Sequence, residues 1–142
     1  MSHSKVKIWI HGILGVKNRE NLITPDIEKQ VHELIKTQLI NSNCLIKEIN
    51  GNTNHVHILF LLSPQKTISE IFKQIKGSVS HEINSKNLTK NKFSWQVGYG
   101  AFSVSESKIN ETAKYIQNQK IHHTKITFKE EYEKFINLYH LE

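Results

Sequence analysis

Two histidines stand one residue apart inside the apolar run TNHVHILFLL, residues 53–62. Side chains alternate across a β-strand, so His55 and His57 project from one face while the apolar residues at even positions project from the other. Two imidazoles placed in this way can bind a single metal ion. The alternative is a pair of hydrogen-bonded histidines at the start of a strand, and the spacing alone leaves both interpretations open.

A second set of polar residues lies in ESKINETAKYIQNQKIHH, residues 106–123, which has helical periodicity. Its apolar residues form one stripe: Ile109, Ala113 and Ile116. At about 100° per residue, Tyr115 lies about 120° from the centre of this stripe. Gln119 and His122 share its side of the helix. A tyrosine needed only for packing would lie on the stripe, so we interpret Tyr115 as a functional residue; an exposed surface tyrosine is the alternative.

The chemistry expected of such a tyrosine is attack on phosphorus, which forms a phosphotyrosine ester and divides one displacement into two. The ordinary pKa of a tyrosine is near 10, so the hydroxyl needs a base or cation nearby. A divalent metal would also polarise the phosphate. Imidazoles with an amide oxygen suit Mn²⁺ or Mg²⁺, although imidazole ligands would equally admit zinc or nickel.

The elements that would position these residues follow the order β-α-β-β-α-β. Strands are expected over 5–13, 44–51, 55–62 and 93–105, and helices over 24–40 and 67–83. This order predicts an α+β, ferredoxin-like split βαβ sandwich, an antiparallel sheet with helices on one face. Further helices are expected at about 108–122 and 128–140, within a single domain over 1–142. The histidine face continues as Leu59 and Leu61, and we expect another subunit to cover it.

The composition limits the class of protein. The formal net charge is +6, built from lysine with Arg19 as the one arginine, which suits a polyanionic partner but also an ordinary solvated surface. No apolar run approaches the roughly 20 residues that span a bilayer, and the N-terminus lacks a signal-peptide pattern. Cys44 is the single cysteine. We therefore expect a cytoplasmic protein with no membrane association.

Five segments together resemble the single-tyrosine HUH transposases (His-hydrophobe-His), the IS200-like family that includes the REP-associated tyrosine transposases. The segments are KNRENLI, INGNTNHVHILF, IKGSVSHEIN, WQVGYGAFSVS and YIQNQKIHH. The resemblance implies that Tyr115 is the catalytic nucleophile, and that His55, His57 and Gln119 bind Mg²⁺ or Mn²⁺. It implies cleavage and rejoining of single-stranded DNA through a 5′-phosphotyrosine intermediate.

The same resemblance implies a homodimer, with active sites shared between subunits, that recognises a DNA hairpin at the ends of a mobile element. It places the protein in a bacterial or archaeal cell, associated with the nucleoid when bound to DNA. Lys17, Arg19, Lys73 and Lys76 are candidate phosphate contacts, with surface solvation as the alternative. Stacking on bases is a further expectation for three aromatic residues, with core packing as the alternative: Trp95, Tyr99 and Phe102.

Other functions stay open at this point. One alternative is a domesticated, non-catalytic DNA- or RNA-binding protein on the same fold, which would need neither the histidine pair nor Tyr115. Another is a replication or relaxase nuclease with the same HUH chemistry. A two-histidine phosphodiesterase is disfavoured because the sequence has no second His-x-Ser/Thr pair. His122 and His123 have no assigned role.

Overall fold

The computed structural model describes residues 4–141, so the domain predicted over 1–142 extends at both ends beyond the described residues. Four strands form one sheet: β1 (Trp9–Gly15), β2 (Leu45–Asn52), β3 (His55–Leu61) and β4 (Gly100–Val104). Their spatial order is β2-β3-β1-β4, and every neighbouring pair is antiparallel. This is the ferredoxin-like arrangement that the order of elements predicted.

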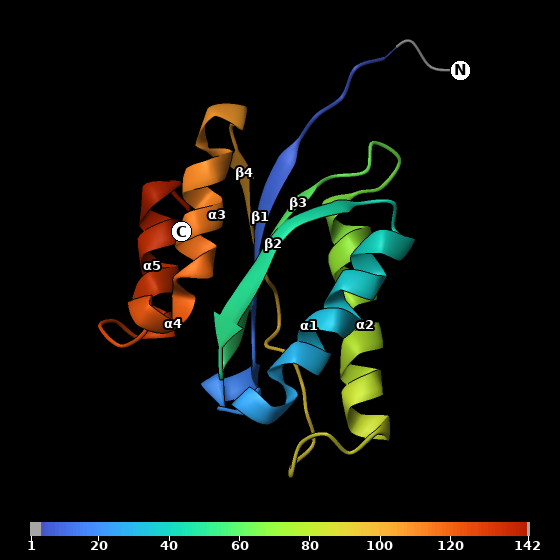
Figure 1. The fold of residues 1–142 in the computed structure, drawn as a ribbon, viewed down its shortest axis with the longest axis vertical. Coiled ribbons are helices and arrows are strands. Elements are labelled where there is room, and N and C mark those ends of the chain that lie inside the picture. The colour runs from blue at the N-terminus through green and yellow to red at the C-terminus, as the bar shows by residue number, and fades with distance from the viewer. Residues whose placement is uncertain (1–3, 142) are drawn as a thin grey trace.

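Helices lie on both sides of this sheet (Figure 1). Helices α1 (Pro25–Asn41) and α2 (Ile68–Ser85) cover one face. Helices α3 (Ile109–Gln117), α4 (Gln119–His122) and α5 (Phe128–Leu138) cover the other. In this structure the chain's own C-terminal helices bury the histidine face, where the sequence led us to expect another subunit. After β4, the short 3₁₀ turn η2 (Glu106–Lys108) leads directly into α3. Apolar side chains of α3 pack against Leu59 on that face of the sheet.

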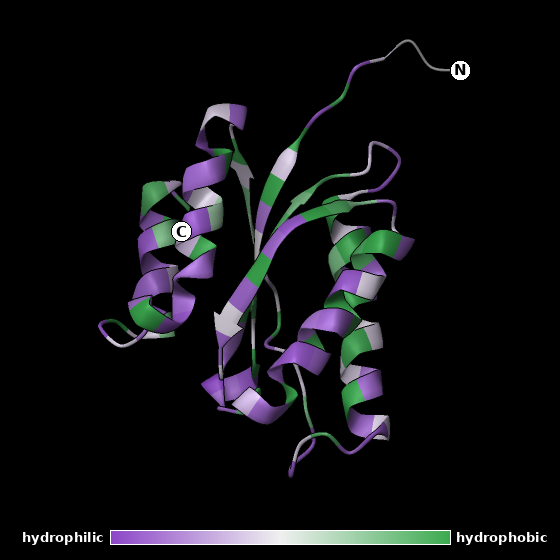
Figure 2. Cartoon of the chain, in the orientation of Figure 1, coloured by the Kyte–Doolittle hydropathy of each residue, from purple (hydrophilic) through white to green (hydrophobic). Residues whose placement is uncertain are grey.

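The main core lies between the sheet and the pair α1 and α2. The even-numbered side chains of β3, Val56, Ile58 and Phe60, are fully buried there. Gly12 of β1 gives this layer room, because a Cβ at that position would lie 2.6 Å from Cζ of Phe72 on α2. Hydrophilic and hydrophobic residues alternate along the helices of both layers, as expected of helices that turn one side to the sheet (Figure 2).

Two helix starts follow the sequence signals closely. Thr67 and Thr127 each accept a hydrogen bond from the backbone N–H of Glu70 and Glu130, whose side chains bond back to the threonine N–H. These capping boxes fix the first turns of α2 and α5. Thr24 precedes α1 with Pro25 as the first helical residue, but its hydroxyl contacts Asp26 and does not cap the helix backbone.

Two predicted strands differ from the observed ones. The strand expected over 5–13 is observed as β1, which begins at Trp9 and ends at Gly15. It begins at Trp9 because the neighbouring strand β3 ends at Leu61, the residue paired with Trp9, and is followed only by a hydrogen bond from Leu62 N to Ile8 O. The strand expected over 93–105 is regular only over β4. Before β4, Trp95 forms one isolated β-bridge. Nζ of Lys76 donates hydrogen bonds to the carbonyl oxygens of Gln96 and Gly98, at 2.8 and 2.9 Å.

A second 3₁₀ turn, η1 (Lys17–Arg19), connects β1 towards α1. Along residues 4–141, we find no helix that is both long enough and apolar enough to cross a bilayer.

Candidate metal and nucleophile site

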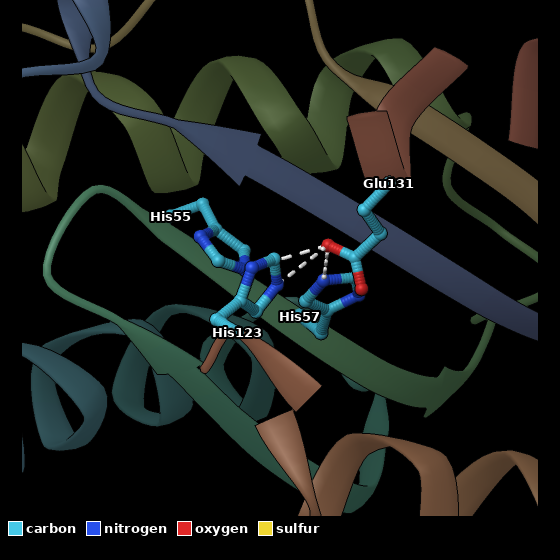
Figure 3. Close-up of side chains that lie close together, drawn as sticks. All are labelled: His55, His57, His123 and Glu131. Carbon is cyan, nitrogen blue, oxygen red and sulfur yellow. Dashed lines mark hydrogen bonds and ion pairs between the residues drawn. The ribbon is translucent and has the colours of Figure 1, made fainter. Parts of the chain in front are cut away.

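Four metal-binding side chains meet between the sheet and the C-terminal helices (Figure 3). His55 and His57 project from β3, His123 follows α4, and Glu131 comes from the first turn of α5. One ligand atom from each lies within 4.8 Å of all the others. The side chains of His55, His57 and Glu131 are almost completely buried, so the cluster lies beneath the surface.

The spacing of the donor atoms matches a coordination sphere. Oε1 of Glu131 lies 3.0 Å from Nε2 of His57, 3.0 Å from Nε2 of His123 and 3.5 Å from Nε2 of His55. Ligands about 2.1 Å from a metal ion are about 3.0 Å apart at octahedral angles and about 3.4 Å apart at tetrahedral angles. These separations are compatible with the four side chains binding one divalent cation.

Each of these imidazoles is oriented through its other nitrogen. Nδ1 of His55 lies 2.8 Å from Oδ1 of Asn54, and Nδ1 of His123 lies 3.0 Å from the carbonyl oxygen of Ile126. Nδ1 of His57 lies 2.7 Å from Nε2 of His11 on β1. All three Nε2 atoms are thereby left to face the centre. Such second contacts are typical of metal-binding histidines, because they fix the tautomer and the orientation of the ring.

Gln119 completes the cluster from the start of α4. Its Oε1 lies 2.9 Å from Nε2 of His55 and 3.0 Å from Nε2 of His123, and its side-chain amide donates to Oε2 of Glu131 at 2.9 Å. Gln119 is completely buried. The structure thus brings all three predicted ligands together and adds His123 and Glu131 as further donors.

Tyr115 lies at the edge of this cluster. Its hydroxyl donates to Oε2 of Glu131 and lies 3.3 Å from Nε2 of His122. An open groove of about 540 Å³ reaches Tyr115 between β4, α3 and α5, and its lining includes His11, Lys108 and Phe135. The hydroxyl therefore lies beside the donor cluster and beside a cleft that opens to solvent.

Comparison with known proteins identifies the family. The sequence profile described as "Transposase IS200 like" matches residues 4–119, most of the chain. The chain belongs to the IS200-like transposase family. No curated protein matches it.

Two solved structures share the fold of this IS200-like family member. One is a proposed transposase from Deinococcus radiodurans R1, with a TM-score of 0.68 and 19% identity over 84% of this chain and 95% of the other. The second is a REP-associated tyrosine transposase bound to a REP hairpin, with a TM-score of 0.67 and 14% identity over 89% of this chain and 76% of the other. His123 and Glu131 lie beyond the residues that match the family profile.

The electrostatics of the cluster follow from its burial. Burial is the main cause that lowers the pKa of His11 to about 3 and that of His55 to about 3, with His57 adding to both. Burial alone would raise the pKa of Glu131, but without a metal ion its hydrogen bonds with His123, His57 and Tyr115, in which the Nε2 atoms of the two imidazoles carry the protons, outweigh burial and hold that pKa far below its ordinary value. Burial and the carboxylate of Glu131 raise the pKa of Tyr115 well above 10.

These charges test whether the residues fit a metal ion. Glu131 is ionised and only 1% exposed, while burial keeps His11 and His55 neutral at ordinary pH. A buried anion needs compensating positive charge, because leaving it unpaired is energetically costly. A divalent cation among the imidazoles, the amide oxygen and the carboxylate would provide that charge. The residues of this IS200-like family member therefore fit a divalent metal.

The four candidate phosphate contacts lie away from this cluster. Lys17 and Arg19 are exposed in η1. Lys73 and Lys76 are on α2, on the other side of the sheet. Lys73 lines a groove between α1 and α2, whereas Lys76 holds the carbonyls of residues 96 and 98. The structure does not bring these four side chains together with the HUH histidines.

The three aromatic residues proposed to stack on bases pack against other side chains, two of them buried and Tyr99 partly buried. Trp95 and Phe102 are buried, at 7% and 4% exposed. The ring of Tyr99 stacks on Phe72 with centroids 4.2 Å apart. Core packing accounts for these contacts.

Sequence reasoning missed three residues that orient or extend the site. His11 was one residue of a strand pattern, Asn54 was part of a turn, and Glu131 was one of several glutamates in FKEEYEKF. The capping box drew attention to Glu130, the residue before the one that is buried. His123 carried a signal, the His-His pair that ends YIQNQKIHH, but no role could be assigned to it.

Proposed function

We propose that this IS200-like transposase cleaves and rejoins single-stranded DNA through a phosphotyrosine intermediate on Tyr115, with a divalent metal ion as cofactor. One observation carries the proposal: the hydroxyl of Tyr115 lies against a buried cluster that contains His55, His57 and Gln119. A non-catalytic binding protein would need no such arrangement. The same geometry would serve a replication or relaxase nuclease; the family match favours a transposase.

The metal would be held by Nε2 of three histidines together with side-chain oxygens of Gln119 and Glu131. Bound there, a divalent cation supplies a Lewis acid that polarises the scissile phosphate. Three imidazoles among the donors favour Mn²⁺ over Mg²⁺, which prefers oxygen ligands. His11, Asn54 and the carbonyl of Ile126 would hold the rings in position.

In the proposed reaction, Oη of Tyr115 forms a bond to phosphorus and the bond from phosphorus to the 3′-oxygen breaks. The products are a 5′-phosphotyrosine linkage and a free 3′-hydroxyl. Attack by a 3′-hydroxyl on the phosphotyrosine reverses the step and rejoins the strand. The phosphotyrosine linkage conserves the energy of the phosphodiester bond, so the rejoining step needs no external energy source.

The proposed partner is single-stranded DNA that carries a hairpin, by analogy with the structural neighbour that is bound to a REP hairpin. Lys17, Arg19, Lys73 and Lys76 stay predicted phosphate contacts outside the catalytic cluster. A homodimer with shared sites also stays a prediction. The proposed setting is the cytoplasm of a bacterial or archaeal cell.

The experiment that tests this function is adduct formation on a hairpin-bearing single-stranded oligonucleotide with Mn²⁺. We expect a covalent protein–DNA species that mass spectrometry places on Tyr115. Tyr115→Phe should abolish it, and the control Tyr99→Phe, whose ring packs on Phe72 in the other layer, should retain it. An adduct on Tyr115→Phe would falsify the assignment of the nucleophile.

A second measurement tests the cofactor. A ligand that binds only the folded state stabilises it by about 2.7 kcal/mol at one hundred times its Kd. Adding Mn²⁺ should therefore raise the melting temperature of the wild-type protein, and His57→Ala should lose this increase. A melting temperature that does not respond to Mn²⁺, Mg²⁺, Zn²⁺ or Ni²⁺ would contradict a metal site.

A further inference from the structure

Glu131 contacts the candidate metal ligands with one oxygen and the candidate nucleophile with the other. Oε1 lies 3.0 Å from Nε2 of His57 and of His123. Oε2 accepts hydrogen bonds from the hydroxyl of Tyr115 and from the side-chain amide of Gln119. We propose that Glu131 is a catalytic residue that accepts the proton of Tyr115 during attack on the phosphate, an inference that rests on the proposed function.

The proton needs an acceptor because the hydroxyl of Tyr115 is the donor in its hydrogen bond to Oε2 of Glu131. As Oη forms its bond to phosphorus, the oxygen becomes positively polarised and acidic, and its proton passes to Oε2 of Glu131. The 3′-oxygen leaves with the electron pair of the broken bond and takes a proton from solvent. Atoms and charges then balance without a further reactant.

The same carboxyl group serves the reverse step. When a 3′-hydroxyl attacks the phosphotyrosine, Oη of Tyr115 is the leaving group and needs a proton. The protonated Glu131 returns it across the same hydrogen bond. One residue therefore acts as base during cleavage and as acid during rejoining, as microscopic reversibility requires.

Glu131 is better placed for this role than the other nearby base, His122. Nε2 of His122 lies 3.3 Å from the hydroxyl of Tyr115, at the long end of a hydrogen bond, and its side chain is 31% exposed. The carboxylate accepts the hydrogen bond of the tyrosine hydroxyl and is almost completely buried. Contacts from His57, His123 and Gln119 fix its orientation, so its acceptor oxygen is directed at the tyrosine before substrate binds.

Helix α5 holds this carboxylate in place. The capping box of Thr127 fixes its first turn, and Phe128 stacks on the ring of His55 with centroids 4.2 Å apart and planes 7° apart. One turn beyond Glu131, Phe135 stacks on Phe102 of β4 at 5.2 Å. Residues 128, 131 and 135 lie on one side of the helix, so these aromatic contacts position the acid between them.

The test compares Glu131→Gln with wild type in single-turnover adduct formation at saturating Mn²⁺. Glutamine keeps the size and the oxygen but accepts no proton at this step, so we expect the rate to fall by about 10² to 10⁴. Glu133→Gln, an exposed glutamate on the same helix, is the matched control and should retain the wild-type rate. Circular dichroism and Mn²⁺ titration of each variant show that it is folded and binds metal.

Chemical rescue, measured together with Mn²⁺ affinity, separates proton acceptance from a structural or metal-binding role. In Glu131→Ala at saturating Mn²⁺, added formate should restore part of the rate of adduct formation, because a small carboxylate can enter the vacated position. A rescue that only follows a gain in Mn²⁺ affinity would overturn the proposal. Formate should leave wild type and Glu133→Gln unchanged. A variant that only loosens α5 would gain nothing from formate, and that result would overturn the proposal.

The outcomes distinguish this inference from the function on which it rests. If wild type forms no adduct with any hairpin oligonucleotide, the proposed function fails and the acceptor role fails with it. If wild type forms the adduct and Glu131→Gln forms it equally fast, only the acceptor role is overturned. A faster Glu131→Gln would also overturn it and would show that the carboxylate blocks the nucleophile. A larger loss in His122→Gln than in Glu131→Gln would assign the proton to His122.

Discussion

Nε2 of His11 lies 2.7 Å from Nδ1 of His57, across the pairing of β1 with β3. His11 is 3% exposed, and its pKa of about 3, lowered mainly by burial, keeps it neutral and able to accept the Nδ1 proton of His57. That contact leaves Nε2 of His57 facing Glu131 at 3.0 Å. His11 is thus a positioning residue for His57, the proposed metal ligand, which it adjoins in space and precedes by 46 positions in the chain.

Replacing His11 by leucine should weaken Mn²⁺ binding by about 10- to 100-fold, the usual effect of losing a residue that orients a metal-binding histidine. Isothermal titration measures the affinity. The control is His81→Leu, which removes an exposed imidazole from α2, far from the cluster. Equal affinities for His11→Leu and wild type would show that β3 alone orients His57.

Lys120 connects α4, on one side of the sheet, to α1, on the other side. Its Nζ lies 2.8 Å from Oε2 of Glu28 on α1, and it also donates to Oδ1 of Asn50 and the carbonyl of Gly51 on β2. The lysine side chain is 51% exposed, so solvent screening keeps the ion pair itself to about 1 kcal/mol or less.

We therefore expect Lys120→Met to change the free energy of unfolding only slightly and to speed amide hydrogen exchange in α4 relative to wild type. Lys114→Met, at an exposed position on α3, is the control and should exchange like wild type. Unchanged exchange in Lys120→Met would mean that packing alone holds α4 on β2.

Two glycines should respond to alanine with opposite signs. At Gly12, a Cβ would lie 2.6 Å from Cζ of Phe72 and 2.9 Å from Cγ1 of Ile58, so Gly12→Ala should destabilise the protein by about 1–3 kcal/mol. At Gly77, inside α2, the added Cβ would have no described heavy atom within 4 Å apart from its chain neighbours and the backbone of its own helix. Gly77→Ala should therefore stabilise the protein by about 0.5–1 kcal/mol. Urea denaturation measures both, and equal signs would contradict the packing.

His32 should contribute a pH dependence to stability. It is 9% exposed on α1 with Nε2 unpaired among the described residues, and burial, its largest influence, lowers its pKa below 6.5. At a pH between the pKa of His32 in the folded chain and its pKa in the unfolded chain, His32 is protonated only in the unfolded chain. The stability that neutral His32 contributes is thus present above about pH 6.5 and is lost as the pH falls through the lowered value.

Wild type should consequently lose more free energy of unfolding than His32→Leu between pH 7.5 and 5.5. The excess is at most about 1.4 kcal/mol for each pH unit below 6.5. The neighbouring charges on Glu28, Lys120, Lys36 and Glu33 are the same in both proteins, so the difference between the two pH profiles belongs to His32. Parallel profiles would sink this prediction.

The sequence predicted the sheet well because its strands and helices carry strong local signals. The even-numbered residues of β3 and the threonine caps of α2 and α5 depend on periodicity and near neighbours. The residue types over 93–99 predict a strand, but the segment is a loop. Lys76 of α2 donates hydrogen bonds to two of its carbonyl oxygens, which therefore do not pair with another strand. A local pattern contains no information about such a distant donor.

The same limit applies to the site. His55, His57, Tyr115 and Gln119 could be found because each stands out from the periodicity of its own element. Glu131 does not stand out, since an acidic residue in the first turn of a helix is ordinary. Only the packing of α5 on β3 and β4 shows that its side chain is buried.

Helix α5 brings one of the donors, yet it lies outside the sheet and meets it largely through aromatic side chains such as Phe128 and Phe135. Near its C-terminal end, Leu138 is 69% exposed. Detachment of α5 would remove Glu131 from the cluster while the pairing of the four strands stays intact. Warming should therefore release α5 and the ion before the strands separate, and the increase in melting temperature with Mn²⁺ should belong to that first step.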